Sequence, residues 1–269
     1  MITAERHRQI SNAEGQEPSA PFSDITLIQS GLYPDGKVTT IRGGDSEDPL
    51  MEAAAMLMNS VETALVNSPP RRWLQRFEAA RLVALGGRTP GARVAELGCG
   101  SGYGTKLILD VFGAAHVDAV DLDPAMVAKA GRRLARYAGR VNVAEGSATD
   151  LAYAFSPGGG GDASYDAVFE FAIIHHIPNW RDAVGEVARV LRPGGRFFFD
   201  EVTAAALARP TYKRLFEHPT EDRFTAGEFL AELQRQGLEV GERWRTYVGS
   251  DYLLGVAVRA PSDSRGDRG

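Results

Sequence analysis

Four glycines occupy alternate positions in the stretch VAELGCGSGYGTKLIL, residues 94–109, directly after a short apolar run. Glycine is costly inside regular structure, because it adds backbone entropy to the unfolded chain and has no side chain to pack. A cluster this dense indicates that something approaches the backbone closely. The candidates are a nucleotide phosphate, a different nucleotide-like cofactor and a tight turn of the chain itself.

Two phosphate-binding patterns fail on this loop. The dinucleotide fingerprint G-x-G-x-x-G needs a third glycine, but counting from Gly98 that position is Tyr103, and counting from Gly100 it is Thr105. The P-loop needs a glycine directly before its lysine, whereas Thr105 precedes Lys106 here. A nicotinamide-dependent oxidoreductase is therefore a disfavoured alternative, and the P-loop is excluded.

An acidic residue lies on each side of the glycine loop. Glu96 stands two residues before Gly98, and Asp121 closes the next apolar run. A carboxylate placed about 20 residues beyond such a loop can accept hydrogen bonds from the hydroxyls of a ribose. Because this carboxylate would repel a 2′-phosphate, we expect a ligand with a free ribose.

Short apolar runs alternate with helical patterns after the loop, which predicts a parallel sheet with helices on both faces. Residues 238–248 and 252–260 are separated by only three residues, too few for a helical crossover, so these two strands must pair antiparallel. The predicted fold is α/β, with a doubly wound, seven-stranded, mostly parallel sheet that ends in an antiparallel hairpin strand. Other strands are expected at 93–97, 116–122, 141–145, 165–171 and 196–202, and helices at 104–112, 123–138, 179–191 and 225–236.

Composition divides the chain into parts. The α/β domain is expected at 91–260, with 203–224 as a lid-like insertion, since this segment is long for a crossover. An N-terminal helical or lid extension precedes it at 21–90. The polar segments 1–20 and 261–269 are expected to be tails.

The charge balance and the cysteine content restrict the class of protein. A formal net charge of -5 disfavours a nucleic-acid or anionic-membrane partner. The single cysteine, Cys99, excludes an intramolecular disulfide and suits a reducing compartment. No secretory signal is visible, and no apolar run approaches the ~20 residues of a membrane span. We expect a cytoplasmic protein without a membrane span, and the sequence leaves its oligomeric state open.

The passage E-x-G-x-G-x-G from Glu96 to Gly102 resembles the first motif of the class I S-adenosylmethionine-dependent methyltransferases. Asp121 and the closing hairpin fit the same family. The stretch YDAVFEFAIIHHIPNWRDAVGEVARVLRPGGRFFFDEV, residues 165–202, resembles the small-molecule branch related to quinone-biosynthesis enzymes. The resemblance covers residues 71–259 and implies that the domain transfers a methyl group from S-adenosylmethionine to an oxygen, carbon or nitrogen atom of a small molecule.

The resemblance also implies a cofactor site. Glu96 and the loop backbone would hold the methionine portion, Asp121 the ribose, and Leu122 would pack on adenine. The family often has an aspartate after the third strand, where this chain has Ser147, so the serine hydroxyl, the Ala148 backbone or Asp150 is left to recognise adenine. The implied cofactor-binding residues are Glu96, Gly98, Cys99, Gly100, Gly102, Asp121, Leu122, Ser147, Ala148, Glu170 and Phe171.

Polar residues at the predicted ends of the fourth and fifth strands are candidates for acting on the acceptor. An oxygen acceptor must lose its proton, and a histidine suits that task near neutral pH. His175 and His176 are equal candidates for the base, or they form a locally bonded pair that starts a helix. Glu201, beside Asp200, is a candidate for orienting a histidine or accepting a substrate proton, or it serves as a cap. No ligand spacing predicts a metal.

Aromatic residues on both sides of the predicted site suggest a hydrophobic or aromatic acceptor. Trp73 and Phe77 of the N-terminal extension are candidates for one wall, although simple packing is favoured for them. Met51, Met56 and Met58 belong to the core or to a substrate entrance. The insertion supplies the candidate contacts Tyr212, Phe216, His218 and Arg223.

Other functions stay open at this point. A protein of the same fold that binds S-adenosylmethionine without transferring its methyl group, such as a cyclase or a scaffold, shares every motif above. A nucleic-acid amino-methylase is disfavoured, because residues 170–173 read EFAI where that class has an Asn/Asp-Pro-Pro-aromatic motif.

Overall fold

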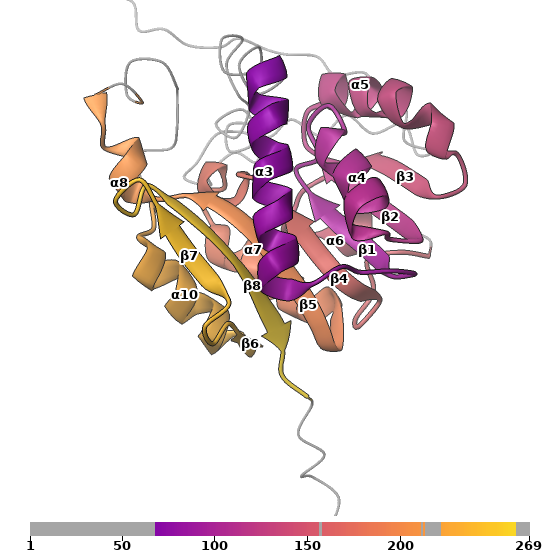
Figure 1. The fold of residues 1–269 in the computed structure, drawn as a ribbon. Coiled ribbons are helices and arrows are strands. Elements are labelled where there is room, and N and C mark those ends of the chain that lie inside the picture. The colour runs from indigo at the N-terminus through magenta and orange to yellow at the C-terminus, as the bar shows by residue number, and fades with distance from the viewer. Residues whose placement is uncertain (1–67, 156–157, 211, 213–221, 262–269) are drawn as a thin grey trace, which may run out of the picture. The chain divides into compact units, whose positions relative to one another are not determined.

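The computed structural model describes residues 68–155, 158–210, 212 and 222–261 (Figure 1). Its eight strands form one mixed sheet in the order β3-β2-β1-β4-β5-β8-β6, with β7 also paired to β8. The strands are β1 Arg93–Leu97, β2 His116–Asp121, β3 Val141–Glu145, β4 Tyr165–Glu170, β5 Leu191–Val202, β6 Leu238–Glu239, β7 Trp244–Tyr247 and β8 Tyr252–Arg259. The predicted tail at 1–20, residues 262–269 of the other predicted tail, and Met51, Met56 and Met58 of the N-terminal extension lie outside the described residues.

The described helices separate most of these strands. Two of them continue in a different helical form, because α4 runs into the π-helical turn η1 and α5 runs into the 3-10 turn η2. The helices are α3 Pro69–Gly86, α4 Tyr103–Leu107, η1 Ile108–Phe112, α5 Pro124–Leu134, η2 Ala135–Tyr137, α6 Leu151–Ala154, η3 Ile174–His176, α7 Trp180–Val190, α8 Ala204–Leu207 and α10 Ala226–Arg235.

The sheet confirms the predicted fold class. Strands β1 to β5 pair in parallel, and β8 pairs antiparallel with β5. The strand predicted at 238–248 is split, because β6 and β7 both pair with β8 but the chain leaves the ladder between them, where Gly241 has a φ of +56°. The eight strands therefore occupy seven positions. Strand β5 also begins earlier than predicted, at Leu191 instead of residue 196.

Two apolar cores cover the two faces of the sheet. Successive side chains of a strand point to opposite faces. In β5, Phe197 and Phe199 accordingly belong to one core, and Phe198 belongs to the other. Helices α7 and α10 contribute to the first core, and α3, which crosses the near face of the sheet in Figure 1, contributes to the second. No helix of the described ranges is long and apolar enough to span a membrane.

Local signals fix where the helices begin. Ser68 caps α3 by accepting a hydrogen bond from the Arg71 backbone N–H, and prolines fill the first turn. Asp123 caps α5 in the same way through Ala125. Thr225 starts α10 through a capping box with Glu228. Because β1, β2, β4 and β5 pair in parallel, their carboxyl ends lie at one edge of the sheet, where ligands of such folds bind.

Candidate functional site

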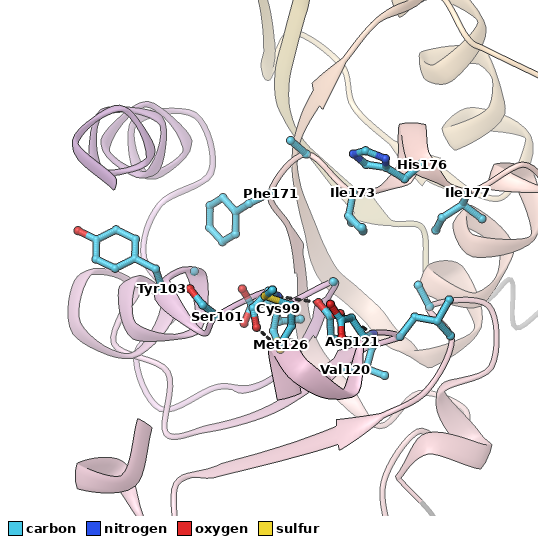
Figure 2. A pocket seen from close by; sticks show the side chains of 18 of the residues that line it. Cys99, Ser101, Tyr103, Val120, Asp121, Met126, Phe171, Ile173, His176 and Ile177 are labelled. Atoms are coloured by element: carbon cyan, nitrogen blue, oxygen red, sulfur yellow. Dashed lines mark hydrogen bonds between the residues drawn. The ribbon is translucent and has the colours of Figure 1, made fainter. Parts of the chain in front are cut away.

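A pocket opens at this edge, between the glycine loop, the end of β2 and the loop that follows β4 (Figure 2). Helix α3, which packs on the face of the sheet that carries the second core, adds Arg71 and Gln75 to the lining. The pocket brings together most of the predicted cofactor residues and one of the two histidines. The predicted residues that line it are Glu96, Gly98, Cys99, Gly100, Asp121, Leu122, Ser147, Ala148, Phe171 and His176. Those that do not line it are Gly102, Glu170, His175 and Glu201.

Close packing explains two of the glycines. Gly98 has a φ of +61°, and a Cβ there would stand 2.3 Å from Cγ1 of Ile173. Gly104 is the fourth glycine, outside the recognised motif, and its Cβ would stand 2.2 Å from Oε1 of Glu96 and 2.8 Å from Phe171. The missing side chain at Gly104 thus makes room for the Glu96 carboxyl group.

Glu96 is a buried acid without a basic partner among the described residues. Its side chain accepts a hydrogen bond from the Thr105 hydroxyl. Burial and the nearby charge of Asp121 raise the pKa of Glu96 to about 8, although the Thr105 hydrogen bond opposes the shift. A cationic group that entered this end of the pocket would favour the carboxylate form and be stabilised by it.

Asp121 is oriented by the backbone. Its Oδ2 accepts a hydrogen bond from the Gly100 N–H at 2.7 Å, and its Oδ1 accepts one from the Asp123 N–H at 2.9 Å. Burial raises the pKa of Asp121 despite these two bonds. A carboxylate oxygen has two lone pairs, so each oxygen can still accept a hydroxyl of a ribose.

The loop after β3 forms another part of the pocket. Ser147 and Ala148 line it, and the Ser147 hydroxyl lies 2.7 Å from the Thr149 hydroxyl. Asp150 is not a lining residue, because it caps α6 by accepting a hydrogen bond from the Tyr153 N–H at 3.0 Å. Of the adenine-recognition candidates, the serine and the alanine therefore face the pocket.

The two adjacent histidines have different surroundings. His176 lines the pocket, and its ring lies 4.2 Å from the ring of His175, measured between centroids. His175 is buried, and its Nδ1 lies 2.8 Å from Oε2 of Glu201. Burial alone would raise the pKa of Glu201, but the charge and hydrogen bond of His175 bring it below its usual range. An ionised carboxylate only accepts hydrogen bonds, so the hydrogen lies on Nδ1 of His175.

Glu201 also holds the loop after β4. Its Oε1 accepts hydrogen bonds from the backbone N–H groups of Ile174 at 2.6 Å and Ile173 at 3.2 Å. Glu170 lies beside it, and burial together with the charge of Glu201 raises the pKa of Glu170 well above its usual range. The Glu170 carboxyl accepts a hydrogen bond from the Asp200 N–H at 2.6 Å. These acids bind the chain and do not face the pocket.

The face of helix α3 that lines the pocket is not the face that was predicted. Trp73 and Phe77 are 72% and 42% exposed, so they form neither a pocket wall nor a core contact. Arg71 and Gln75, which lie one turn apart, line the pocket instead. The helix turns this way because Ala79 and Leu82 enter the core.

The insertion after β5 contributes no lining residue among those described. Tyr212 forms a hydrogen bond with the Tyr252 hydroxyl and packs against the cluster of Val202, Ala206 and Leu207. Arg223 is half-buried and does not line the pocket. Phe216 and His218 lie outside the described residues. Their predicted contact with substrate stays a prediction.

Cys99 lies in the glycine loop as a small buried side chain. Burial raises the pKa of its thiol well above its usual range, so the reactive thiolate is disfavoured. No group of acids, histidines and cysteines in the described part of the chain could hold a metal ion.

Sequence reasoning missed several lining residues. The helical spacing of Arg71 and Gln75 was visible, but nothing showed which face of α3 turns toward the sheet. Six further lining residues had no feature in the sequence that predicted a place in the pocket. The glycine loop and the start of α4 contribute Ser101 and Tyr103, α5 contributes Met126, and the segment after β4 contributes Ala172, Ile173 and Ile177.

The fold and the pocket define an α/β domain with a nucleotide-type cofactor site. Residues 94–195 match the methyltransferase domain family. The chain is 33% identical over 178 residues, 66% of its length, to a "Probable S-adenosylmethionine-dependent methyltransferase" of Mycolicibacterium smegmatis. It is 32% identical over 143 residues, 52% of its length, to a ubiquinone biosynthesis O-methyltransferase of Xanthomonas campestris. These matches identify residues 94–195 as a methyltransferase domain of the class I S-adenosylmethionine-dependent type.

The likeness to these relatives is partial. The chain spans 63% of the length of the first relative and 56% of the second. Among solved structures, a Burkholderia thailandensis 1,6-didemethyltoxoflavin-N1-methyltransferase superposes with a TM-score of 0.55 at 21% identity, over 81% of this chain and 93% of that one. At this identity the match supports the fold.

The pocket residues fit S-adenosylmethionine, the family's methyl donor. Glu96 is a buried carboxyl without a basic partner among the described residues, which suits the ammonium of the methionine portion. Asp121 retains acceptor capacity for the ribose. Gly100 lines the pocket, and apart from its two chain neighbours no described residue has an atom within 4 Å of the place where its Cβ would stand, so the backbone there is open to a ligand.

Proposed function

We propose that this protein transfers a methyl group from S-adenosylmethionine to a small molecule. The proposal rests on one observation above all, that His176 lines the same pocket as the glycine loop and Asp121 (Figure 2). When bound, the cofactor supplies a methyl group on a sulfonium, which an acceptor removes by in-line displacement. A side chain able to take a proton thus shares one pocket with the donor-binding residues.

The protein's own residues have separate tasks in this proposal. Glu96 and Asp121 hold and orient the two ends of the donor. Phe171 and Ile173 are apolar lining residues that exclude water from the reacting atoms. His176 takes the proton of the acceptor or orients it. His175 and Glu201 hold the loop that carries His176.

An apolar or aromatic acceptor with an ionisable hydroxyl group suits the pocket best. Tyr103, Phe171, Ile173 and Ile177 give the lining its apolar character. An O-methyl transfer also gives a histidine a reason to be there, because a hydroxyl must lose its proton. The relative from Xanthomonas campestris carries the name of an O-methyltransferase, which favours the same acceptor atom.

A two-stage experiment tests the proposal. Thermal denaturation with S-adenosylhomocysteine, S-adenosylmethionine or NADH comes first, and we expect only the first two to raise the melting temperature. Labelled donor is then offered with a panel of phenols, fatty acids, amines and activated carbon acids, and demethylated donor is measured.

The outcomes separate the functions. Donor consumption with phenols or fatty acids alone supports the proposal. Tight donor binding without demethylated product across the panel favours a cofactor-binding scaffold or cyclase. Stabilisation by NADH alone contradicts the assignment of the donor.

A further inference from the structure

The outer face of α3 exposes apolar side chains. Trp73 is 72% exposed and Phe77 is 42% exposed, and Leu74 beside them is 41% exposed. Ala80 and Ala84 are exposed as well. Trp73, Phe77, Ala80 and Ala84 follow one another three or four residues apart, so they form one line along the helix, here called the α3 stripe. A contiguous apolar surface bordered by polar residues marks an interaction site.

Arginines border the α3 stripe on both sides. A helix turns by about 100° per residue, which places Arg76 on one side of the stripe and Arg81 on the other. The guanidinium carbon of Arg81 lies 4.8 Å from the centroid of the Phe77 ring. Neither arginine forms an ion pair with a residue that the structure describes. Glu78, the single acid of α3, is buried and pairs with Arg71, so the outer face of the helix carries only positive charge.

Helix α5 adds positive charge on the same side of the sheet. Both helices contribute to the second core, and α5 contains no acid. Lys129, Arg132, Arg133 and, in η2, Arg136 lie at helical spacing on one side of this segment. Burial, and then the positive charge of Arg72 in α3, lower the pKa of Arg133. The two helices therefore bring like charges close together, which favours an anionic partner.

The combination of rings and arginines selects the kind of partner. A nucleic acid would use the positive charge but would leave the apolar stripe in water. A helix that lies at a membrane interface uses both, because its Trp and Phe rings enter the headgroup layer while its arginines contact anionic lipids. The net charge of -5 is a sum over the whole chain and does not describe this side of the domain.

We propose that α3, with the neighbouring end of α5, binds the surface of an anionic lipid bilayer, with Trp73 and Phe77 among the headgroups. The contact is peripheral and does not depend on the proposed function. Arg71 and Gln75, on the opposite side of the same helix, line the pocket. The pocket wall then lies about one helix diameter, ~10–12 Å, from the lipid surface, a position that suits an apolar acceptor.

Vesicle binding by the full-length protein tests the inference, with no donor or acceptor present. The vesicles contain phosphatidylcholine alone or an equal mixture of phosphatidylcholine and phosphatidylglycerol. Sedimentation gives the bound fraction, and tryptophan emission reports the surroundings of Trp73. One double variant is Trp73→Ala with Phe77→Ala, and the other is Arg76→Gln with Arg81→Gln. Tyr153→Ala is the matched control, because Tyr153 is 81% exposed on α6, which packs on the first core at the other face of the sheet.

We expect the wild type to bind the anionic vesicles, to bind the neutral ones far less, and to dissociate as the salt concentration rises. Tryptophan emission should shift to shorter wavelength on binding, and Trp73→Phe should remove the shift. The aromatic double variant should bind at least about tenfold more weakly. The arginine double variant should bind about 10- to 30-fold more weakly, since each basic residue near an anionic surface contributes about fivefold. Tyr153→Ala should stay within about twofold of the wild type.

Several results would overturn the inference. A wild-type protein that ignores anionic vesicles does so directly, and so does equal weakening by Tyr153→Ala. Binding to a mixed-sequence DNA duplex that needs Arg76 and Arg81 but not Trp73 assigns the face to nucleic acid. A wild-type dimer that the aromatic double variant dissociates, without vesicle binding, assigns it to a second copy. Trp73 emission shielded from iodide before any vesicle is added means that the chain itself covers the stripe. Donor binding is measured separately, so failure of the proposed function stays distinct from all of these.

Discussion

The carboxylate of Glu201 and the imidazole of His175 form a buried pair, with Oε2 and Nδ1 2.8 Å apart and side chains 0% and 4% exposed. The same carboxylate accepts backbone hydrogen bonds from Ile173 and Ile174. One buried charge therefore fixes both a histidine and the loop that lines the pocket. The pair therefore holds the pocket-lining loop in place without lining the pocket itself.

Replacing Glu201 tests this role. Glu201→Gln removes the buried negative charge and replaces one acceptor oxygen by an N–H₂ donor, which then faces the N–H donors of His175 or of the loop, so we expect the free energy of unfolding to fall by about 3–5 kcal/mol. Urea denaturation measures the change. Glu242→Gln is the control, because Glu242 is exposed, and it should lie within about 0.5 kcal/mol of the wild type. A Glu201→Gln protein as stable as the control would show that the pair contributes little.

The two histidines should respond differently to replacement. His176→Ala removes the histidine that lines the pocket, and we expect turnover to fall about 10²- to 10⁴-fold, while the dissociation constant of S-adenosylhomocysteine stays within about threefold. His175→Ala should chiefly lower the melting temperature, since His175 contacts Glu201. Equal turnover in the His176 variant and the wild type would remove that residue from the mechanism.

Donor binding should depend on pH through Glu96. Its pKa of about 8 in the free protein lies above the ordinary 4.5, so this group stabilises the fold at low pH and loses that contribution as the pH rises through about 8. A bound ammonium favours the ionised form. We therefore expect S-adenosylhomocysteine affinity to rise between about pH 6 and about pH 7.5, with release of nearly one proton on binding.

Calorimetry in buffers of different ionisation enthalpy measures that proton. Glu96→Gln should abolish the release and flatten the pH dependence over the same range. A wild-type protein that binds the ligand without releasing a proton would mean that Glu96 is already ionised.

Two glycines that lie in helices, Gly104 and Gly131, distinguish the effect of a steric clash from the effect of helix propensity. Gly104→Ala places a Cβ 2.2 Å from Oε1 of Glu96, so we expect the donor to bind at least about tenfold more weakly. Gly131→Ala is the matched change in α5, where a Cβ meets no atom of the described residues within 4 Å beyond its chain neighbours and its own helix backbone, and it should stabilise the fold by about 0.5–1 kcal/mol. Unchanged donor affinity in Gly104→Ala would show that Glu96 moves aside easily.

Much of the sheet and of the donor half of the site could be predicted from the sequence, because both depend on local patterns. Alternation along FFF placed Phe197 and Phe198 on opposite faces, and parallel strand ends had to bring Asp121 to the glycine loop. Contacts between distant segments had no local signal. Which of His175 and His176 faces the pocket depends on a carboxylate 26 residues from His175 in the chain.

Helix α3 shows the same limit. Its spacing predicts faces but not their direction, and Trp73 is exposed because Ala79 and Leu82 face the core. The position of Arg71 at the pocket then follows from packing at the far end of the helix. No pattern around Arg71 itself could have indicated it.

The glycine loop limits which positions of this domain can change during evolution. At Gly98 and Gly104 even one added methyl group collides with Ile173 or Glu96, so natural variation there is closed off. The insertion after β5 contributes no described residue to the pocket lining, so changes there leave these close contacts intact. Descendants of such a protein should therefore keep one donor over long periods while their acceptors change, with new specificities arising far from the glycines.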